Sequence, residues 1–196
     1  MSDAAFLELS NYAGLTATAV LTFNFVLGMM LATAYKTNPY WKRLPANIQK
    51  ADVNAIHNYT AYIALLLVLL HVWLLLLDKS SKFTFVDIVF PLNAPHQSFA
   101  VALGTVSLFA LSVVIITTQK LIKKKMSFRT WKNIHLISYG TAILFVLHGM
   151  LMDPHLKDSE PDFFDGEKLL SFGCGLVLIA AAVMRYKFYI RNKSEV

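Results

Sequence analysis

Apolar residues in this chain gather in five long stretches, and short polar connections separate each stretch from the next. Each apolar run is about 20 residues long, which is the length that a helix needs to cross the roughly 30 Å hydrocarbon core of a membrane. The pattern therefore predicts an all-α fold, an integral membrane bundle of five helices in a single domain. The predicted spans are about 12–35, 53–77, 98–118, 133–152 and 169–190.

One further apolar segment lies between the second and third predicted spans. Phe83 to Pro95 is apolar but short, and it carries two prolines. It is too short to cross the bilayer. We expect it to lie at the membrane interface or to re-enter there, covering that end of the bundle.

Charge changes this picture by giving the bundle a direction. The formal net charge is +6, which could indicate a nucleic-acid partner, but Lys and Arg flank the apolar stretches as they do in membrane proteins. Four of the 18 fall in 36–50, six in 119–132 and four in 185–193, all on one side of a five-span protein. The positive-inside rule then predicts an outer N-terminus and a cytoplasmic C-terminus in a bacterial inner membrane. The expected partner is the lipid bilayer and not nucleic acid.

Composition narrows the possible chemistry. The chain is 56% hydrophobic and has one cysteine, Cys174, which lies inside an apolar stretch. A single cysteine excludes a disulfide framework, a cysteine-rich zinc site and a cysteine-held iron–sulfur cluster.

The candidate functional residues are histidines inside the apolar spans. His57 and His71 lie in the second span, and His135 and His148 lie in the fourth. An ionisable side chain at membrane depth is costly and marks a functional site by default, and neutral imidazole is a good iron ligand. The 14-residue and 13-residue spacings correspond to about 21 Å and about 20 Å along a helix axis. Two such helices are suited to hold two planar macrocycles, one above the other.

Chain direction predicts how these histidines pair. One span separates the second from the fourth, so the two run parallel. His57 and His135 should hold an inner iron, and His71 and His148 an outer iron. The sequence has no Cys-x-x-Cys-His motif, so the predicted cofactors are two non-covalent haems of b type. Thirteen residues make about 3.6 turns, so His135 and His148 do not share one face of a straight helix. Either the helix is distorted near 138–140, or the two haems meet it from different sides.

Three segments around these histidines resemble the ferric reductase-like transmembrane domain. The first is Ile56-His57-Asn58-Tyr59-Thr60-Ala61-Tyr62, continuing to Leu70-His71-Val72; the second is Ala102-Leu103-Gly104; the third is Phe128-Arg129-Thr130-Trp131-Lys132-Asn133-Ile134-His135, continuing through Ser138-Tyr139 to Leu147-His148-Gly149. The resemblance covers roughly residues 12–185.

That resemblance implies a function. Members of the family, such as ferric reductases and the membrane part of NADPH oxidases, pass electrons through two b haems held by four such histidines. We therefore expect an electron-transfer subunit of a larger hetero-oligomeric system. The family's flavin and nicotinamide domains do not follow the last span, so a quinone, or a flavin on a partner protein, is the further cofactor we expect. Electrons would pass from a cytoplasmic or quinol donor to an acceptor on the outer side.

Two other interpretations stay open at this stage. A quinol-oxidising cytochrome b subunit of a respiratory or photosynthetic complex also holds two haems between its second and fourth spans, although no arginine follows His71 closely. An accessory subunit with structural haems, or with none, is the third interpretation.

Secondary candidates surround the two predicted haems. Gly14 and Gly28 could let the first helix approach both of them. His96 and His155, with the acidic run 153–167, lie in outer connections and could serve an acceptor. Four basic residues could contact the propionates of the inner haem or dock an acidic donor: Lys42, Arg43, Arg129 and Lys132.

Overall fold

Long helices make up almost all of the structure, a computed structural model that describes residues 3–153, 156 and 165–194. No strand occurs among these described residues. The five long helices are α1 (Asp3–Leu31), α4 (Val53–Leu77), α6 (Ser98–Thr118), α8 (Phe128–Leu151) and α9 (Gly166–Ser194). The short elements between them are η1 (Tyr35–Thr37), α2 (Pro39–Lys42), α3 (Ala46–Gln49), α5 (Phe85–Val89), η2 (Pro91–Asn93) and α7 (Lys120–Lys123).

All five long helices are long and apolar enough to cross a membrane. The all-α fold class and the presence of five membrane-spanning helices are therefore confirmed, and the chain is an integral membrane protein. Polar caps fix two of the helix starts. The Asp52 carboxylate accepts from the backbone N–H groups of Asn54 and Ala55 at the start of α4, and the Ser127 hydroxyl accepts from Thr130 N–H at the start of α8.

The first predicted span was wrong at both ends. Helix α1 begins at Asp3, about nine residues earlier than predicted, and ends at Leu31, before Ala34 turns into the left-handed region at φ 46°. The predicted span left Ser10 outside the helix. In the structure Ser10 is completely buried against α4, so its polar group is satisfied inside the bundle. Helix α8 also begins five residues earlier than predicted, at Phe128.

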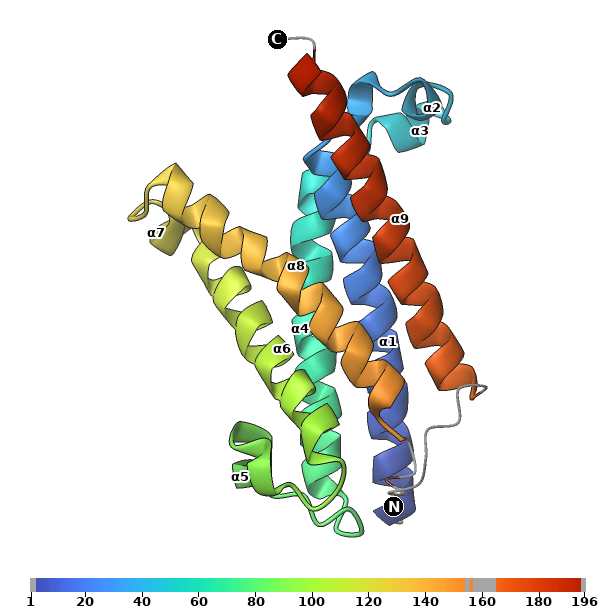
Figure 1. The fold of residues 1–196 in the computed structure, drawn as a ribbon, viewed down its shortest axis with the longest axis vertical. Helices are drawn as coiled ribbons and strands as arrows, with labels where there is room; N and C mark the ends of the chain where they lie inside the picture. The colour runs from blue at the N-terminus through green and yellow to red at the C-terminus, as the bar shows by residue number, and fades with distance from the viewer. Residues whose placement is uncertain (1–2, 154–155, 157–164, 195–196) are drawn as a thin grey trace.

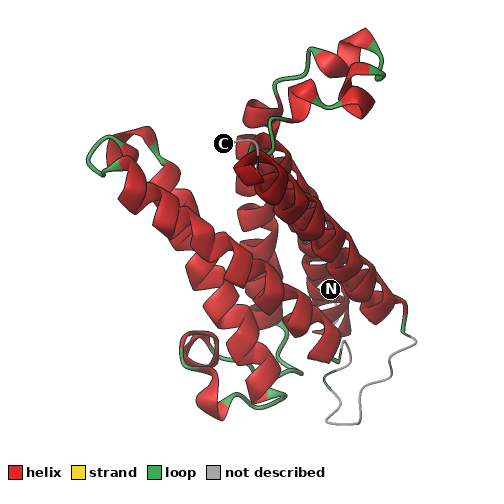
Figure 2. Ribbon diagram, turned by 45° about the horizontal axis from the view of Figure 1, so that its top comes forward, coloured by secondary structure: helices red, strands yellow, loops and turns green. Residues whose placement is uncertain are grey.

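The helices pack as two antiparallel pairs with α9 against both. Helix α1 packs along α4, α6 packs along α8, and α9 contacts α1 and α8 (Figure 1). The connections 32–52 and 119–127 lie at one end, which we call the basic end. The start of α1, the segment α5 and the end of α8 lie at the other, the far end. Figures 1 and 2 show that the two pairs approach each other at the far end and diverge at the basic end.

Two apolar clusters hold the bundle together. The middle cluster lies half-way along the helices, around the fully buried Ala64 and the stacked rings of Phe25 and Phe145, whose centres are 5.9 Å apart. The far-end cluster joins α4 and α6 to the α5 segment: Leu75, Phe83, Ile88, Val101 and Leu156. The outward faces stay apolar and exposed, as a lipid-facing surface requires.

The segment 83–95 does not span the membrane, as predicted. Its short helix α5 begins with a capping box between Thr84 and Asp87, and Ile88 is turned inward while Phe85 and Val86 are 71% and 64% exposed. The Thr105 hydroxyl donates to Ile88 O at 2.8 Å and ties the segment to α6. The segment therefore covers the far end of the bundle.

Candidate functional site

Two histidine pairs face each other between α4 and α8. The rings of His57 and His135 form the basic-end pair, with centres 6.4 Å apart and planes at 75°. The rings of His71 and His148 form the far-end pair, again 6.4 Å apart, with planes at 74°. This is the pairing that chain direction predicts. No group of three or more His, Cys, Asp or Glu that could hold a metal occurs in the described part of the chain.

The first of the two alternatives for the 13-residue spacing in α8, a distorted helix, is not what the structure shows. Helix α8 is unbroken from Phe128 to Leu151, so no distortion of its helical bonding occurs near 138–140. His135 and His148 therefore leave α8 in directions about 140° apart. Each still meets its partner, because α8 crosses α4 obliquely (Figure 1).

The two histidines of α4 are held by α1 in the same way. His71 Nδ1 lies 2.8 Å from Ser10 O, and His57 Nδ1 lies 3.1 Å from Asn24 O. Four residues after each carbonyl stands a glycine. A methyl group on Gly14 would lie 3.0 Å from His71 Nδ1, and one on Gly28 would lie 3.1 Å from His57 Cε1. Glycine therefore makes the room that each imidazole needs to reach the carbonyl.

The side chains of α1 return a hydrogen bond to α4. The Ser10 hydroxyl donates to His71 O at 2.9 Å. The Asn24 side-chain amide donates to His57 O at 2.5 Å and to the Thr60 hydroxyl at 2.7 Å. Each histidine of α4 is thus fixed through both its ring and its backbone.

His148 repeats the arrangement with α6. Its Nδ1 lies 2.7 Å from Ala100 O, and a methyl group on Gly104, four residues later, would lie 2.9 Å from both Nδ1 and Cε1 of the ring. A carbonyl followed four residues later by glycine therefore holds three of the four histidines. We call this arrangement the carbonyl–glycine cradle.

The cradle determines which ring nitrogen carries the proton and which is unprotonated. A carbonyl oxygen can only accept, so Nδ1 must carry the proton in His57, His71 and His148. The unprotonated Nε2 then has its lone pair available for a metal, and a hydrogen bond at Nδ1 raises the basicity of such a ligand.

His135 lacks a cradle. Its buried Nδ1 has no hydrogen-bond partner in the described structure. By residue spacing, the place on α6 where a glycine would serve it is occupied by Thr117, whose hydroxyl donates to Val113 O at 2.8 Å. Instead, the His135 ring stacks on Trp131, with centres 5.2 Å apart and planes at 20°.

A cavity of about 160 Å³ adjoins the far-end pair. Both rings of that pair line it, together with Gly14, Gly104 and the covering residue Ile88. Ile88 is the residue of the segment 83–95 that lines this cavity. A buried hydroxyl at its edge, Ser171 Oγ, has no hydrogen-bond partner in the described structure.

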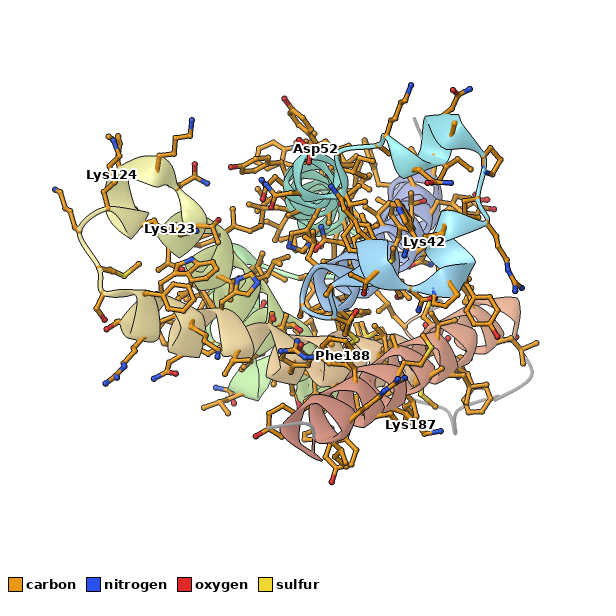
Figure 3. All side chains as sticks on the ribbon, turned by 90° about the horizontal axis from the view of Figure 1, so that it is seen from above. Lys42, Asp52, Lys123, Lys124, Lys187 and Phe188 are labelled. Atoms are coloured by element: carbon orange, nitrogen blue, oxygen red, sulfur yellow. The ribbon has the colours of Figure 1, made fainter. Side chains whose placement is uncertain are left out.

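The basic residues expected near the inner site lie on the surface, and their contact with propionates or with a donor stays a prediction. Lys42, Arg43, Arg129 and Lys132 are all exposed, and Lys42 lies on the connection between α1 and α4 (Figure 3). Two other cations lie over the aromatic rings that flank His135: Lys123 Nζ is 3.9 Å from the ring centre of Trp131, and Arg185 Cζ is 5.0 Å from that of Tyr139. Their place in the sequence gives no hint of this, because the helix packing brings them there.

The two outer histidines differ in what can be said of them. The His96 ring makes an edge contact with Phe83, its centre 6.2 Å away, within the far-end covering segment. His155 and most of the acidic run lie outside the described residues. The idea that this run attracts a cationic acceptor therefore stays a prediction.

These features define a class: a helical integral membrane protein with two half-buried histidine pairs at different depths between the same two helices. A comparison with protein families matches residues 13–147 to the ferric reductase-like transmembrane component. The match covers more than half of the chain, so the chain belongs to that family. No curated protein matches the chain.

Membership of this family indicates a function. Ferric reductase-like transmembrane domains generally bind haem, and transmembrane electron transfer is the activity they suggest. The matched stretch includes His57, His71 and His135 and ends one residue before His148.

Proposed function

We propose that this chain carries electrons across a membrane through two b-type haems, one ligated by His57 and His135 and one by His71 and His148. The observation that carries the proposal is the equal spacing of the two ring pairs. With a metal–nitrogen bond of about 2.0 Å, as for imidazole on zinc, and about 1.2 Å from nitrogen to ring centre, the centres would lie about 6.4 Å apart. Both observed separations are 6.4 Å.

The surrounding residues support the same assignment. The cradles leave Nε2 of three histidines unprotonated and orient each ring rigidly. The helices themselves space the two sites, because 14 residues of α4 correspond to about 21 Å. The middle apolar cluster fills the volume between the sites and excludes water from it.

The haems supply reversible one-electron chemistry at iron, which no side chain of this protein provides. The protein holds their ligands, sets their distance and keeps water away. Exclusion of solvent and the hydrogen bonds on the ligands are also the main influences of a protein on the reduction potential of such a site.

We place the basic end in the cytoplasm, following the positive-inside rule. Figure 3 views the molecule from this end and labels Lys42, Lys123, Lys124 and Lys187 there. Electrons then enter at the basic-end pair from a reduced flavin on a partner, or from a quinol, and leave at the far-end pair. A membrane potential negative inside favours this direction by about 2.3 kcal/mol per electron per 100 mV.

The test is a haem count on single and double histidine variants. Purified protein should contain two haems per chain, extractable by acid acetone. His57→Ala and the double variant His57→Ala/His135→Ala should each retain one haem, whereas His57→Ala/His71→Ala should retain none. The matched control is His96→Ala, which should retain both.

Three outcomes would contradict the proposal. Protein without haem would refute the function itself, and haem that resists acid acetone would refute the b type. Complete loss of haem from the His57→Ala/His135→Ala variant would refute the pairing.

A further inference from the structure

Three aromatic rings follow one another on one face of α8 at the basic end. Trp131, His135 and Tyr139 stand four residues apart, the spacing that places side chains above one another on a helix. Trp131 and His135 are stacked face to face, with ring centres 5.2 Å apart. His135 therefore has an aromatic residue one turn before it and another one turn after it.

Each flanking aromatic ring carries a cation from a different element. Lys123 Nζ lies 3.9 Å from the ring centre of Trp131, and Arg185 Cζ lies 5.0 Å from that of Tyr139. Lys123 is the last residue of α7, and Arg185 belongs to α9. Cations over aromatic faces are attracted by the negative charge of the ring face.

The Trp131 stack takes the place of the missing cradle. Three imidazoles are oriented by a backbone carbonyl on a neighbouring helix, but His135 Nδ1 has no hydrogen-bond partner in the described structure. A ring without such a bond can rotate about its side-chain torsions unless packing stops it. The broad face of Trp131, held by Lys123, is the contact that stops this rotation.

We propose that Trp131 is the positioning residue of His135, and that Lys123 couples the basic-end site to the surface connection 119–127. The inference rests on the proposed function, because it concerns how His135 presents its ring to an iron. It goes beyond that function because it states that the orientation of one of the four histidines, His135, depends on a surface residue, Lys123.

The charge of Lys123 gives this control a direction. Lys123 is solvent-exposed, yet its ammonium lies over the ring that stacks on His135. Oxidised haem carries one more positive charge than reduced haem, so a nearby cation disfavours the oxidised form. Loss of the Lys123 charge should therefore lower the reduction potential of the basic-end haem. A partner protein that draws this ammonium away would have the same effect.

The test compares the two haems of the purified holoprotein in redox titrations and in the electron paramagnetic resonance of the ferric state. In Trp131→Leu the basic-end signal should shift and broaden as the His135 ring loses its fixed orientation, and the far-end signal should stay unchanged. Trp131→Phe, which keeps an aromatic face, should restore much of the native signal.

The lysine is tested separately, because Trp131→Leu removes packing as well as orientation. Lys123→Gln should lower the potential of the basic-end haem alone, and Lys123→Arg should restore it. The matched control is Lys124→Gln, which removes an adjacent exposed charge that makes no ring contact and should leave both potentials near the native values.

The outcomes separate the inference from the proposed function. Two bound haems with an unchanged basic-end signal in both Trp131→Leu and Lys123→Gln would overturn the inference alone. Equal shifts of both haems would also overturn it, because they would indicate general loosening of the bundle. Purified native protein without haem would overturn the proposed function and this inference together.

Discussion

The far-end and basic-end histidine pairs have the same internal geometry but different surroundings. Ring separation is 6.4 Å in both, and the interplanar angles differ by one degree. In the far-end pair both rings are held by backbone carbonyls, beneath an apolar covering segment. In the basic-end pair one ring is held by a carbonyl, and the other by an aromatic side chain with a surface lysine on it.

This difference shows that the same ring geometry can be held either by the backbone or by side chains. A backbone carbonyl in a helix is present whatever residue carries it, so the carbonyl contacts of the far-end pair require only glycines that leave the carbonyl accessible. A side-chain stack depends on residue identity and on the charge above it. The ring orientations in the far-end pair are therefore fixed by the backbone, whereas the orientation of His135 in the basic-end pair can respond to changes at the protein surface.

The largest expected effect comes from filling a cradle. Gly104→Ala places a methyl group 2.9 Å from the His148 ring, closer than real contacts allow, so the far-end haem should be lost. Gly14→Ala and Gly28→Ala, at 3.0 and 3.1 Å, should each weaken a single haem, far-end and basic-end respectively. Haem content per chain measures this. Gly140→Ala, with nothing within 4 Å, is the control, and an equal loss there would refute the cradle.

Opening the far-end cover should have the next largest effect. Ile88→Ala removes a buried side chain from the cavity lining and should cost about 2–5 kcal/mol of stability. It should also speed reduction of the far-end haem by dithionite in water and leave the basic-end haem unaffected. Val86→Ala, on the exposed side of the same short helix, is the matched control. Equally faster reduction of both haems in Ile88→Ala would show that the segment does not protect the far-end haem specifically.

Removing the hydrogen bonds that α1 returns to α4 should have a smaller effect. Ser10→Ala leaves His71 without its hydroxyl partner, and Asn24→Ala leaves His57 O and Thr60 without theirs. Each should destabilise the protein by about 1–3 kcal/mol, the cost of an unsatisfied buried group. Unfolding in mixed micelles measures the loss. Thr16→Ala, which removes an exposed hydroxyl from the same helix, should change little. An equally large loss of stability in Thr16→Ala would show that the contacts of Ser10 and Asn24 with α4 do not account for the effect.

The smallest expected effect concerns pH at the far end only. Hydrogen bonds from the Thr84 hydroxyl and backbone N–H lower the pKa of the Asp87 carboxyl below its usual value. The capping box should therefore be fully formed above the ordinary carboxyl range and should be lost as the pH falls through the lowered value. Amide hydrogen exchange of residues 85–90, corrected for intrinsic rates, should rise in acid. Asp87→Asn should exchange faster already at neutral pH, and its agreement with the native protein there would contradict the argument.

The histidine pairs could be predicted from sequence because ionisable residues stand out in apolar runs. Two histidines in each of two parallel spans leave one sensible pairing, and the structure brings those rings together. Their role as haem ligands stays a prediction. The glycines of α1 were also recognisable, because Gly14 and Gly28 repeat the 14-residue spacing of His57 and His71.

The supports of the site could not be predicted in the same way. Ser10 was placed outside the first span, because a polar residue near a helix start gives no sign of being fully buried. Ala100 acts through its carbonyl, which every residue possesses, so its identity carries no information. Lys123 and Arg185 were missed because distance along the chain does not report which cation the packing brings toward His135.

The repeated spacing on α1 and α4 also constrains how this protein can change. Both cradles on α1 are satisfied at once only because the stretch from Gly14 to Gly28 is as long as the stretch from His57 to His71. Insertion or deletion of one residue in either stretch would rotate one cradle by about 100° away from its ring while the other stayed in place. The cradles therefore fix the number of residues in each stretch. A change in the number of residues between Gly14 and Gly28 therefore requires an equal change between His57 and His71.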